Sequence, residues 1–167
     1  MNKLFYGDNL TIMWKMSAES VDLIYLDPPF NSNRSYNLLY KNTTGLPILE
    51  QIEAFCDTWE FDYEKSEMAY DIPNIMREYG IQNDVVQFWF YLALALKSTN
   101  PKLLAYLAYM TIRLIEMRRI LKSTGSIYLH CDPTASHYLK VVHPYRAALS
   151  LCSVTGFPSS SFNKISM

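Results

Sequence analysis

The chain has 167 residues and half of them are hydrophobic, which fits one globular domain and excludes a disordered segment. Its net charge of −1 weighs against the broadly basic surface of a free-standing duplex-binding protein. Any basic surface must therefore be local, or lie on a part that this sequence does not include. Cys56, Cys131 and Cys152 have no paired spacing, so we expect no disulfide framework, no metal site and a reduced, cytoplasmic setting.

The first thirty residues predict a strand, a helix and a second strand. Residues 3–6 predict a short strand that ends at Gly7, and either Asp8 or Asn9 can cap the helix that follows. The apolar residues of this helix repeat on one face, and they are Leu10, Ile12, Met13 and Met16. We expect the two strands to be parallel, with a right-handed connection.

The segment from Val21 to Asn31 is the most informative part of the sequence. Residues 21–26 form a near-continuous apolar run, which is typical of a parallel strand covered on both faces. Pro28 and Pro29 have no N–H to donate, so the strand must end there, and Pro28 favours an extended Asp27. The carboxylate of Asp27 should then lie at the carboxyl end of a central strand, where open α/β sheets bind their ligands.

These residues suit chemistry on the exocyclic amino group of a nucleobase. Such an amino group is a poor nucleophile because its lone pair is delocalised into the ring. If Asp27 and the carbonyl of Pro28 each accept one of its N–H bonds, the nitrogen moves towards tetrahedral geometry and its lone pair is exposed. Phe30 would stack on a base flipped out of the duplex. The alternative is an ordinary strand end with a Pro-Pro turn.

The polar loop after Phe30 is the candidate contact with DNA. Arg34 could meet a phosphate and Tyr36 could stack on a base, with Asn31 beside them. A plain solvated loop is the alternative for these residues. Residues 48–84 have only a weak pattern. Within them, we expect the acidic and aromatic segment at 57–64 either to pack on the sheet edge or to begin a helix.

The second half predicts two helices, a strand and a further helix. Residues 84–96 form a helix that is apolar nearly all round, which implies burial. Asn100 and Pro101 are typical of a helix start. The basic residues near the end of this helix have two interpretations: they form a solvated face and match the helix dipole, or they contact DNA. Residues 126–131 predict a buried strand next to and parallel with the first. We interpret His130 as a satisfied strand-end histidine, since a pair with Asp132 has no third group to support it. A helix should begin at Ala135.

Asp27-Pro28-Pro29-Phe30 resembles the DPP(Y/F/W) motif of the S-adenosylmethionine-dependent DNA amino-methyltransferases, which modify adenine N6 or cytosine N4. The resemblance extends over residues 3–142 and includes the long segment 113–142. It implies an α/β fold with an incomplete, doubly wound, mostly parallel sheet of the Rossmann-like methyltransferase type. It also implies double-stranded DNA as substrate and S-adenosylmethionine as methyl donor. Asp8 and Asn9 would then lie beside the adenine of the cofactor; a capped turn without a catalytic role is the alternative.

The resemblance ends near Val142, where the sequence changes character. Residues 143–167 contain Pro144, several serines and no periodic pattern, so we expect a partial catalytic domain at 1–142 and an irregular, possibly frame-shifted tail. The five glycines include no G-x-G spacing, and the resembling subclass carries its Gly-rich cofactor motif further along the chain.

The function that we expect is methyl transfer to DNA, with adenine N6 favoured because an aspartate opens the motif. The alternatives are cytosine N4 as acceptor, or a non-catalytic fragment that needs a complementary chain. This chain should be inactive or nearly so alone. A complementary chain or a restriction enzyme could be a partner, and the most apolar run is far shorter than the roughly 20 residues of a membrane span.

Overall fold

The computed structural model describes residues 2–5, 7–28, 62–131, 133–142 and 149–153. The elements, in chain order, are α1 (Asn9–Met13), β1 (Val21–Leu26), α2 (Tyr63–Glu78), α3 (Asn83–Thr99), α4 (Pro101–Ile120), β2 (Leu121–Cys131), α5 (Pro133–Val142) and β3 (Leu149–Ser153). The strand predicted at residues 3–6 is wrong for residues 3–5, which have no regular secondary structure.

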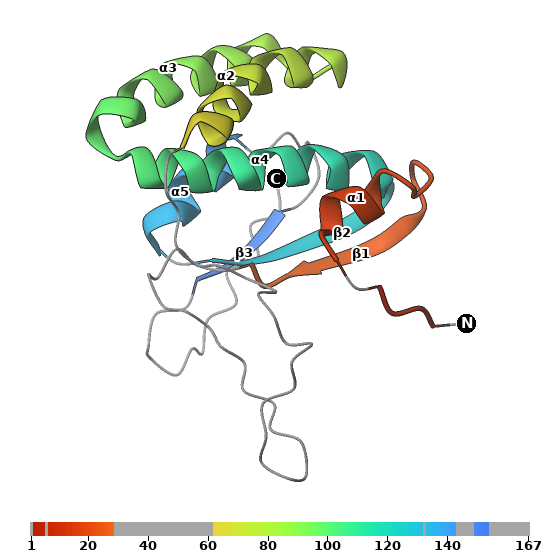
Figure 1. Cartoon of the computed structure of the whole chain (residues 1–167). Helices are drawn as coiled ribbons and strands as arrows, with labels where there is room; N and C mark the ends of the chain where they lie inside the picture. Colours follow the sequence, from red (N-terminus) through yellow and green to blue (C-terminus); the bar gives the residue numbers. More distant parts are fainter. Residues whose placement is uncertain (1, 6, 29–61, 132, 143–148, 154–167) are drawn as a thin grey trace, which may run out of the picture.

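The three strands form one parallel sheet in the order β1-β2-β3 (Figure 1). β1 pairs with β2 from Leu23 opposite Ser126 to Leu26 opposite Leu129, and β2 pairs with β3 from Ile127 opposite Leu149. The prediction of two adjacent parallel strands is therefore confirmed. β3 falls where the sequence predicts no regular element, and the sheet thus continues beyond Val142.

The helices α1, α4 and α5 lie on one side of this sheet (Figure 1). Ile127, Leu129 and Cys131 of β2 are fully buried and alternate with more exposed neighbours. On β1, Leu23 is 58% and Tyr25 69% exposed. In parallel strands, residues in register share a face, so these exposed side chains lie on the side away from the helices. Among the described residues the sheet is covered on one face, whereas the sequence predicts cover on both.

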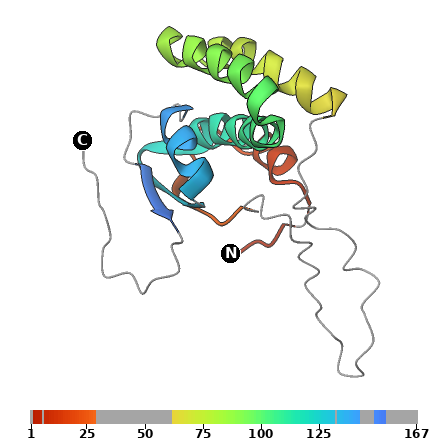
Figure 2. The ribbon, with the colours of Figure 1, turned by 90° about the vertical axis from the view of Figure 1, so that its left-hand side faces the viewer.

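Helix α4 is the centre of the core and lies between the sheet and the pair formed by α2 and α3 (Figure 2). It begins as the sequence predicts, because the Asn100 side chain accepts a hydrogen bond from the amide of Leu103 at 3.2 Å and Pro101 occupies the first turn. Most side chains along α4 are buried, including those of Thr111, Arg113 and Glu116. Arg113 and Glu116 are satisfied by side-chain partners, whereas the Thr111 hydroxyl has no hydrogen-bond partner among the described residues.

The outer layer consists of α2 and α3, and it differs from the sequence prediction at α3. α2 begins at Tyr63 with Asp62 as its N-cap, which agrees with the alternative that the segment at 57–64 begins a helix. Its continuation to Glu78 lies in the weakly patterned region. α3 is not buried all round: Trp89 is fully buried, but Phe90 is 53%, Tyr91 66% and Leu94 58% exposed. The reason is its position, because α3 packs on α2 and α4 with one face and no described element covers the other.

The ladder between β1 and β2 has an irregularity near its start. Val21 pairs with Leu121, but Leu23 pairs with Ser126, so β2 contains three more residues than β1 in this interval. Gly125 lies in it, and a Cβ atom there would come within 2.7 Å of the Leu121 side chain. The close approach of the backbone to Leu121 therefore requires glycine at this position.

Candidate functional site

Two side chains meet where β1 and β2 end. Asp27 follows the last residue of β1, and the register that pairs Leu26 with Leu129 continues to place Asp27 beside His130. The two side chains are bonded, with 2.8 Å between His130 Nδ1 and Asp27 Oδ1. We call them the Asp27–His130 pair. The interpretation of His130 as a strand-end histidine with a hydrogen-bond partner agrees with this contact.

The chemistry of the two groups defines the direction of this hydrogen bond. An ionised carboxylate only accepts, so Nδ1 of His130 must carry the proton that is donated to Asp27. The His130 side chain is 24% and the Asp27 side chain 61% exposed. Within the part of the chain that the structure describes, Oδ2 of Asp27 has no hydrogen-bond partner. The pair thus presents a fixed, accessible acceptor at the carboxyl edge of the sheet.

The other predicted residues of the acceptor site are only partly described. Pro28 is partly buried and follows Asp27 directly, so its carbonyl belongs to the same strand end. Pro29, Phe30, Asn31, Arg34 and Tyr36 lie outside the described residues. Their predicted roles in ending the strand, stacking and contacting DNA therefore stay predictions.

Asp8 and Asn9 lie at the start of α1 and bind Arg113 of α4. Asp8 Oδ1 caps α1 by accepting from the amide of Leu10 at 2.8 Å, and Oδ2 forms an ion pair with the Arg113 guanidinium. Asn9 Oδ1 accepts from Arg113 Nε at 2.9 Å. Arg113 also lies 3.3 Å from the ring centre of Tyr109, and burial raises the pKa of the Tyr109 hydroxyl. We call this group the Arg113 cluster; it accounts for both residues structurally.

Two of the basic residues of α4, Arg113 and Arg119, serve the fold. Arg113 is only 6% exposed. Arg119 donates to Glu116 Oε2 at 2.8 Å and to the carbonyls of Met16 and Met13 at 2.8 and 2.6 Å. These bonds tie α4 to the turn after α1. The two arginines are thus unsuited to bind phosphate, which corrects their interpretation as a contact with DNA. Arg119 lies in the last turn of α4, which agrees with the interpretation through the helix dipole.

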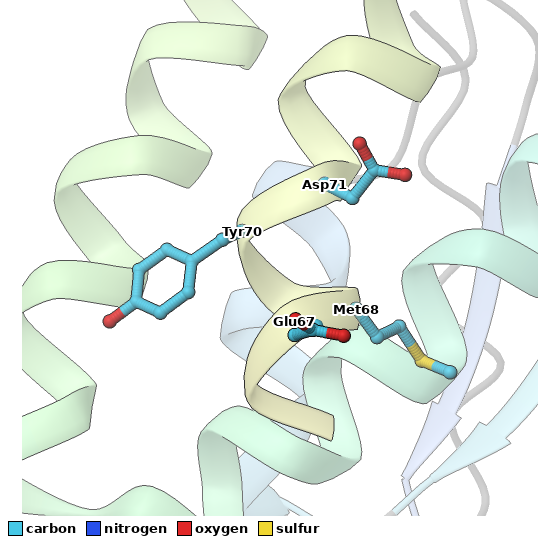
Figure 3. Close-up of a pocket in the computed structure, with 4 residues that line it drawn as sticks. All are labelled: Glu67, Met68, Tyr70 and Asp71. Atoms are coloured by element: carbon cyan, nitrogen blue, oxygen red, sulfur yellow. The ribbon is translucent and has the colours of Figure 1, made fainter. Parts of the chain in front are cut away.

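A shallow pocket lies on the outer helical layer (Figure 3). It is lined by Glu67, Met68, Tyr70 and Asp71 of α2. Its two carboxylates would repel a phosphate backbone, and α4 separates α2 from the sheet (Figure 1). In the described ranges there is no cluster of three metal-ligating side chains, and no helix is long and apolar enough to cross a membrane.

A parallel sheet with helices packed on one face is an α/β arrangement, and proteins of this kind typically bind their ligands at the carboxyl edge of the sheet, where Asp27 lies. The sequence model of the N6_N4_Mtase family, described as DNA methylase, matches residues 21–152, which is more than half of the chain. The chain therefore belongs to this family of DNA methyltransferases. No curated protein and no solved structure matches the chain.

The matched region begins with β1 and ends within β3, one residue before the end of that strand, so it contains the Asp27–His130 pair and nearly all of the described sheet. The mixed fold with its parallel sheet is compatible with part of a methyltransferase domain. Members of the family act on DNA and generally use S-adenosylmethionine. The match continues ten residues beyond the point where the sequence resemblance ends.

Proposed function

We propose that this chain carries the methyl-acceptor site of a DNA methyltransferase that modifies adenine N6, with S-adenosylmethionine as the methyl donor. The observation that supports this proposal best is the Asp27–His130 pair, which lies at the carboxyl edge of the parallel sheet inside the family match. The fold we propose for the complete catalytic unit is the doubly wound sheet of methyltransferases.

The proposed mechanism depends on hydrogen bonds to the amino group. Asp27 accepts one N–H of the flipped base and the carbonyl of Pro28 accepts the other, which localises the lone pair on nitrogen. Phe30 holds the base by stacking, and Pro29 ends the strand so that these groups converge. When bound, S-adenosylmethionine supplies the electrophilic methyl group. After attack the amino nitrogen carries a proton in excess, and Asp27 is the nearest proposed base for it.

The cofactor role proposed for Asp8 and Asn9 fits the Arg113 cluster. Asp8 is 48% exposed, and each carboxylate oxygen has two lone pairs, so it can accept a further donor while it caps α1 and binds Arg113. The cluster would hold the carboxylate in place for a hydrogen bond from the cofactor. Because the same contacts also serve the fold, this role needs its own test.

Adenine N6 is favoured over cytosine N4 because the motif opens with an aspartate. The cytosine-N4 alternative is equally compatible with the family. DNA contacts are proposed for Asn31, Arg34 and Tyr36. The two acceptors are distinguished by the product, since nucleoside chromatography of enzymatically digested DNA separates N6-methyladenine from N4-methylcytosine.

We further propose that the chain alone transfers methyl groups slowly or not at all. Among the described residues β1 is an edge strand, and Leu23, Tyr25 and the outer face of α3 are exposed. A complementary chain with the Gly-rich half of the cofactor site would cover such surfaces. A non-catalytic fragment would associate with that chain but show no saturable binding of S-adenosylmethionine.

The test measures tritiated methyl transfer from S-adenosylmethionine to unmethylated double-stranded DNA. Asp27→Ala should reduce transfer by on the order of 10²–10³-fold, because a preorganised acceptor is lost. Asp22→Ala is the matched control, since Asp22 lies on the same strand and is 75% exposed beside Lys122. An Asp27→Ala rate equal to that of the control would remove Asp27 from the mechanism. Robust turnover by the wild-type chain alone would contradict the proposed dependence on a complementary chain.

A further inference from the structure

We propose that His130 is a positioning residue for the methyl-acceptor site: its imidazole holds the Asp27 carboxylate in one rotamer and leaves Oδ2 to accept the amino hydrogen. This inference rests on the proposed function, because the value of the rotamer depends on an amino group as substrate. It adds to that function a residue outside the Asp-Pro-Pro-Phe motif.

The backbone fixes where the two side chains meet. Four consecutive pairs in register, from Leu23–Ser126 to Leu26–Leu129, lead to Asp27 and His130. His130 lies between Leu129 and Cys131, both fully buried, so its backbone is anchored in the core on either side. The imidazole therefore extends from a rigid strand towards a carboxylate at the point where β1 leaves the sheet.

The hydrogen bond restricts a side chain that would otherwise be free to rotate. Asp27 is 61% exposed and Pro28 directly after it cannot donate an N–H to its carboxylate. Nδ1 of His130, at 2.8 Å from Oδ1, is the donor that the structure gives to this carboxylate. With Oδ1 held, Oδ2 is the oxygen that remains without a partner among the described residues.

A purely stabilising role does not explain this arrangement well. Ion pairs and hydrogen bonds as exposed as this one contribute little to stability, because solvent competes for both groups. Orientation is different, since a misplacement of about 1 Å in a reacting group can cost about 10²-fold in rate. The contact is thus best suited to fixing geometry.

The first test measures the rotamer in the 167-residue chain and requires no catalysis. In wild-type protein the two Hα–Hβ couplings of Asp27, measured by NMR, should have the limiting values of a single staggered χ1 rotamer, either one large and one small or both small. His130→Ala should average the two couplings. His130→Asn should restore them, because the asparagine amide can donate from nearly the same place as Nδ1. His137→Ala, at an exposed position on α5, is the matched control and should change nothing.

The second test measures single-turnover methyl transfer with protein in excess. His130→Ala should lower the rate constant about 10²-fold, leave the DNA concentration for half-saturation within twofold, and be largely rescued by His130→Asn. Averaged Asp27 couplings in the wild type, or couplings unchanged in His130→Ala, would overturn the inference. So would equal transfer rates for the wild type and His130→Ala. A wild-type rate of zero agrees with the proposed dependence on a complementary chain, and the couplings then decide whether His130 positions Asp27.

Discussion

Replacing Asp8 separates its structural role from the cofactor role proposed for it. Asp8→Ala removes the N-cap of α1, which typically costs about 1 kcal/mol. It also leaves Arg113, only 6% exposed, without its carboxylate. Hydrogen bonds to charged groups contribute about 1.5–3 kcal/mol, and the half-exposed Asp8 places this one near the lower end. The free energy of unfolding should therefore fall by about 2.5 kcal/mol.

Urea denaturation followed by circular dichroism measures this loss. With a slope of about 2 kcal/mol per molar urea, the midpoint of Asp8→Ala should fall by about 1.2 M. Asp8→Asn keeps a capping oxygen and the side-chain shape but loses the charge, so its midpoint should fall by roughly half as much. Asp22→Ala, which breaks an exposed pair with Lys122, should stay within about 0.25 M of the wild type.

The structural reasoning would be refuted if Asp8→Ala and Asp22→Ala unfolded at the same urea concentration. If Asp8→Ala were as stable as the control and yet bound less S-adenosylmethionine, Asp8 would serve the cofactor alone. If it were unstable and the cofactor affinity of its folded fraction were unchanged, the Arg113 cluster would be purely structural. The two roles of Asp8 are thus measured independently.

Two further predictions concern the helical layers. Trp89→Phe should lower the free energy of unfolding by about 2–3 kcal/mol, because Trp89 is fully buried and its indole N–H donates to the Ala69 carbonyl at 2.8 Å. Urea denaturation measures this loss, and an unchanged midpoint would contradict the prediction. The hydrogen bond from the Tyr79 hydroxyl to Glu116 raises the pKa of Tyr79 above its ordinary value of 10.0, so the folded state keeps this proton when the unfolded chain loses it. Stability should consequently decline as the pH rises above 10.0, and Tyr79→Phe should make that decline less steep in urea midpoints measured from pH 8 to 11; an equal slope in both proteins would exclude this contribution.

The parts of the fold that the sequence predicts well are those in which local pattern and burial agree. β1 and residues 127–131 of β2 are mostly apolar, whereas the polar residues 122–126, which lengthen β2 at its start, carry no strand pattern. The Asn100-Pro101 start of α4 has a chemical cause within its own first turn. For α2 the sequence predicts only a helix start at 57–64, as one of two alternatives, because Pro73 and many polar residues weaken the helical pattern of residues 63–78. The sequence predicts that α3 is buried on all sides, but an apolar helix does not reveal which layer of the fold it occupies. Packing against α2 and α4 decides which of its faces is buried.

Of the Asp27–His130 pair, the sequence predicts only Asp27 as a site residue. Asp27 follows from its position after β1, and its proposed chemistry from the motif. The contact with His130 depends on the register between strands separated by about a hundred residues, which no local pattern contains. One signal could have indicated it: two polar residues at the ends of neighbouring parallel strands meet at the same edge. Asp132 is nearer to His130 in the sequence and is the partner that the local pattern suggests.

The three surplus residues of β2 before Ser126 have a consequence for how the site tolerates change elsewhere. They divide the β1–β2 ladder into a first contact at Leu121, next to the end of α4, and a separate register that leads to the Asp27–His130 pair. Small shifts of α4, such as those that follow repacking of its buried side chains, can be absorbed in this interval. A substitution in the helical core should therefore change the distance between Asp27 and His130 less than it would in an uninterrupted ladder.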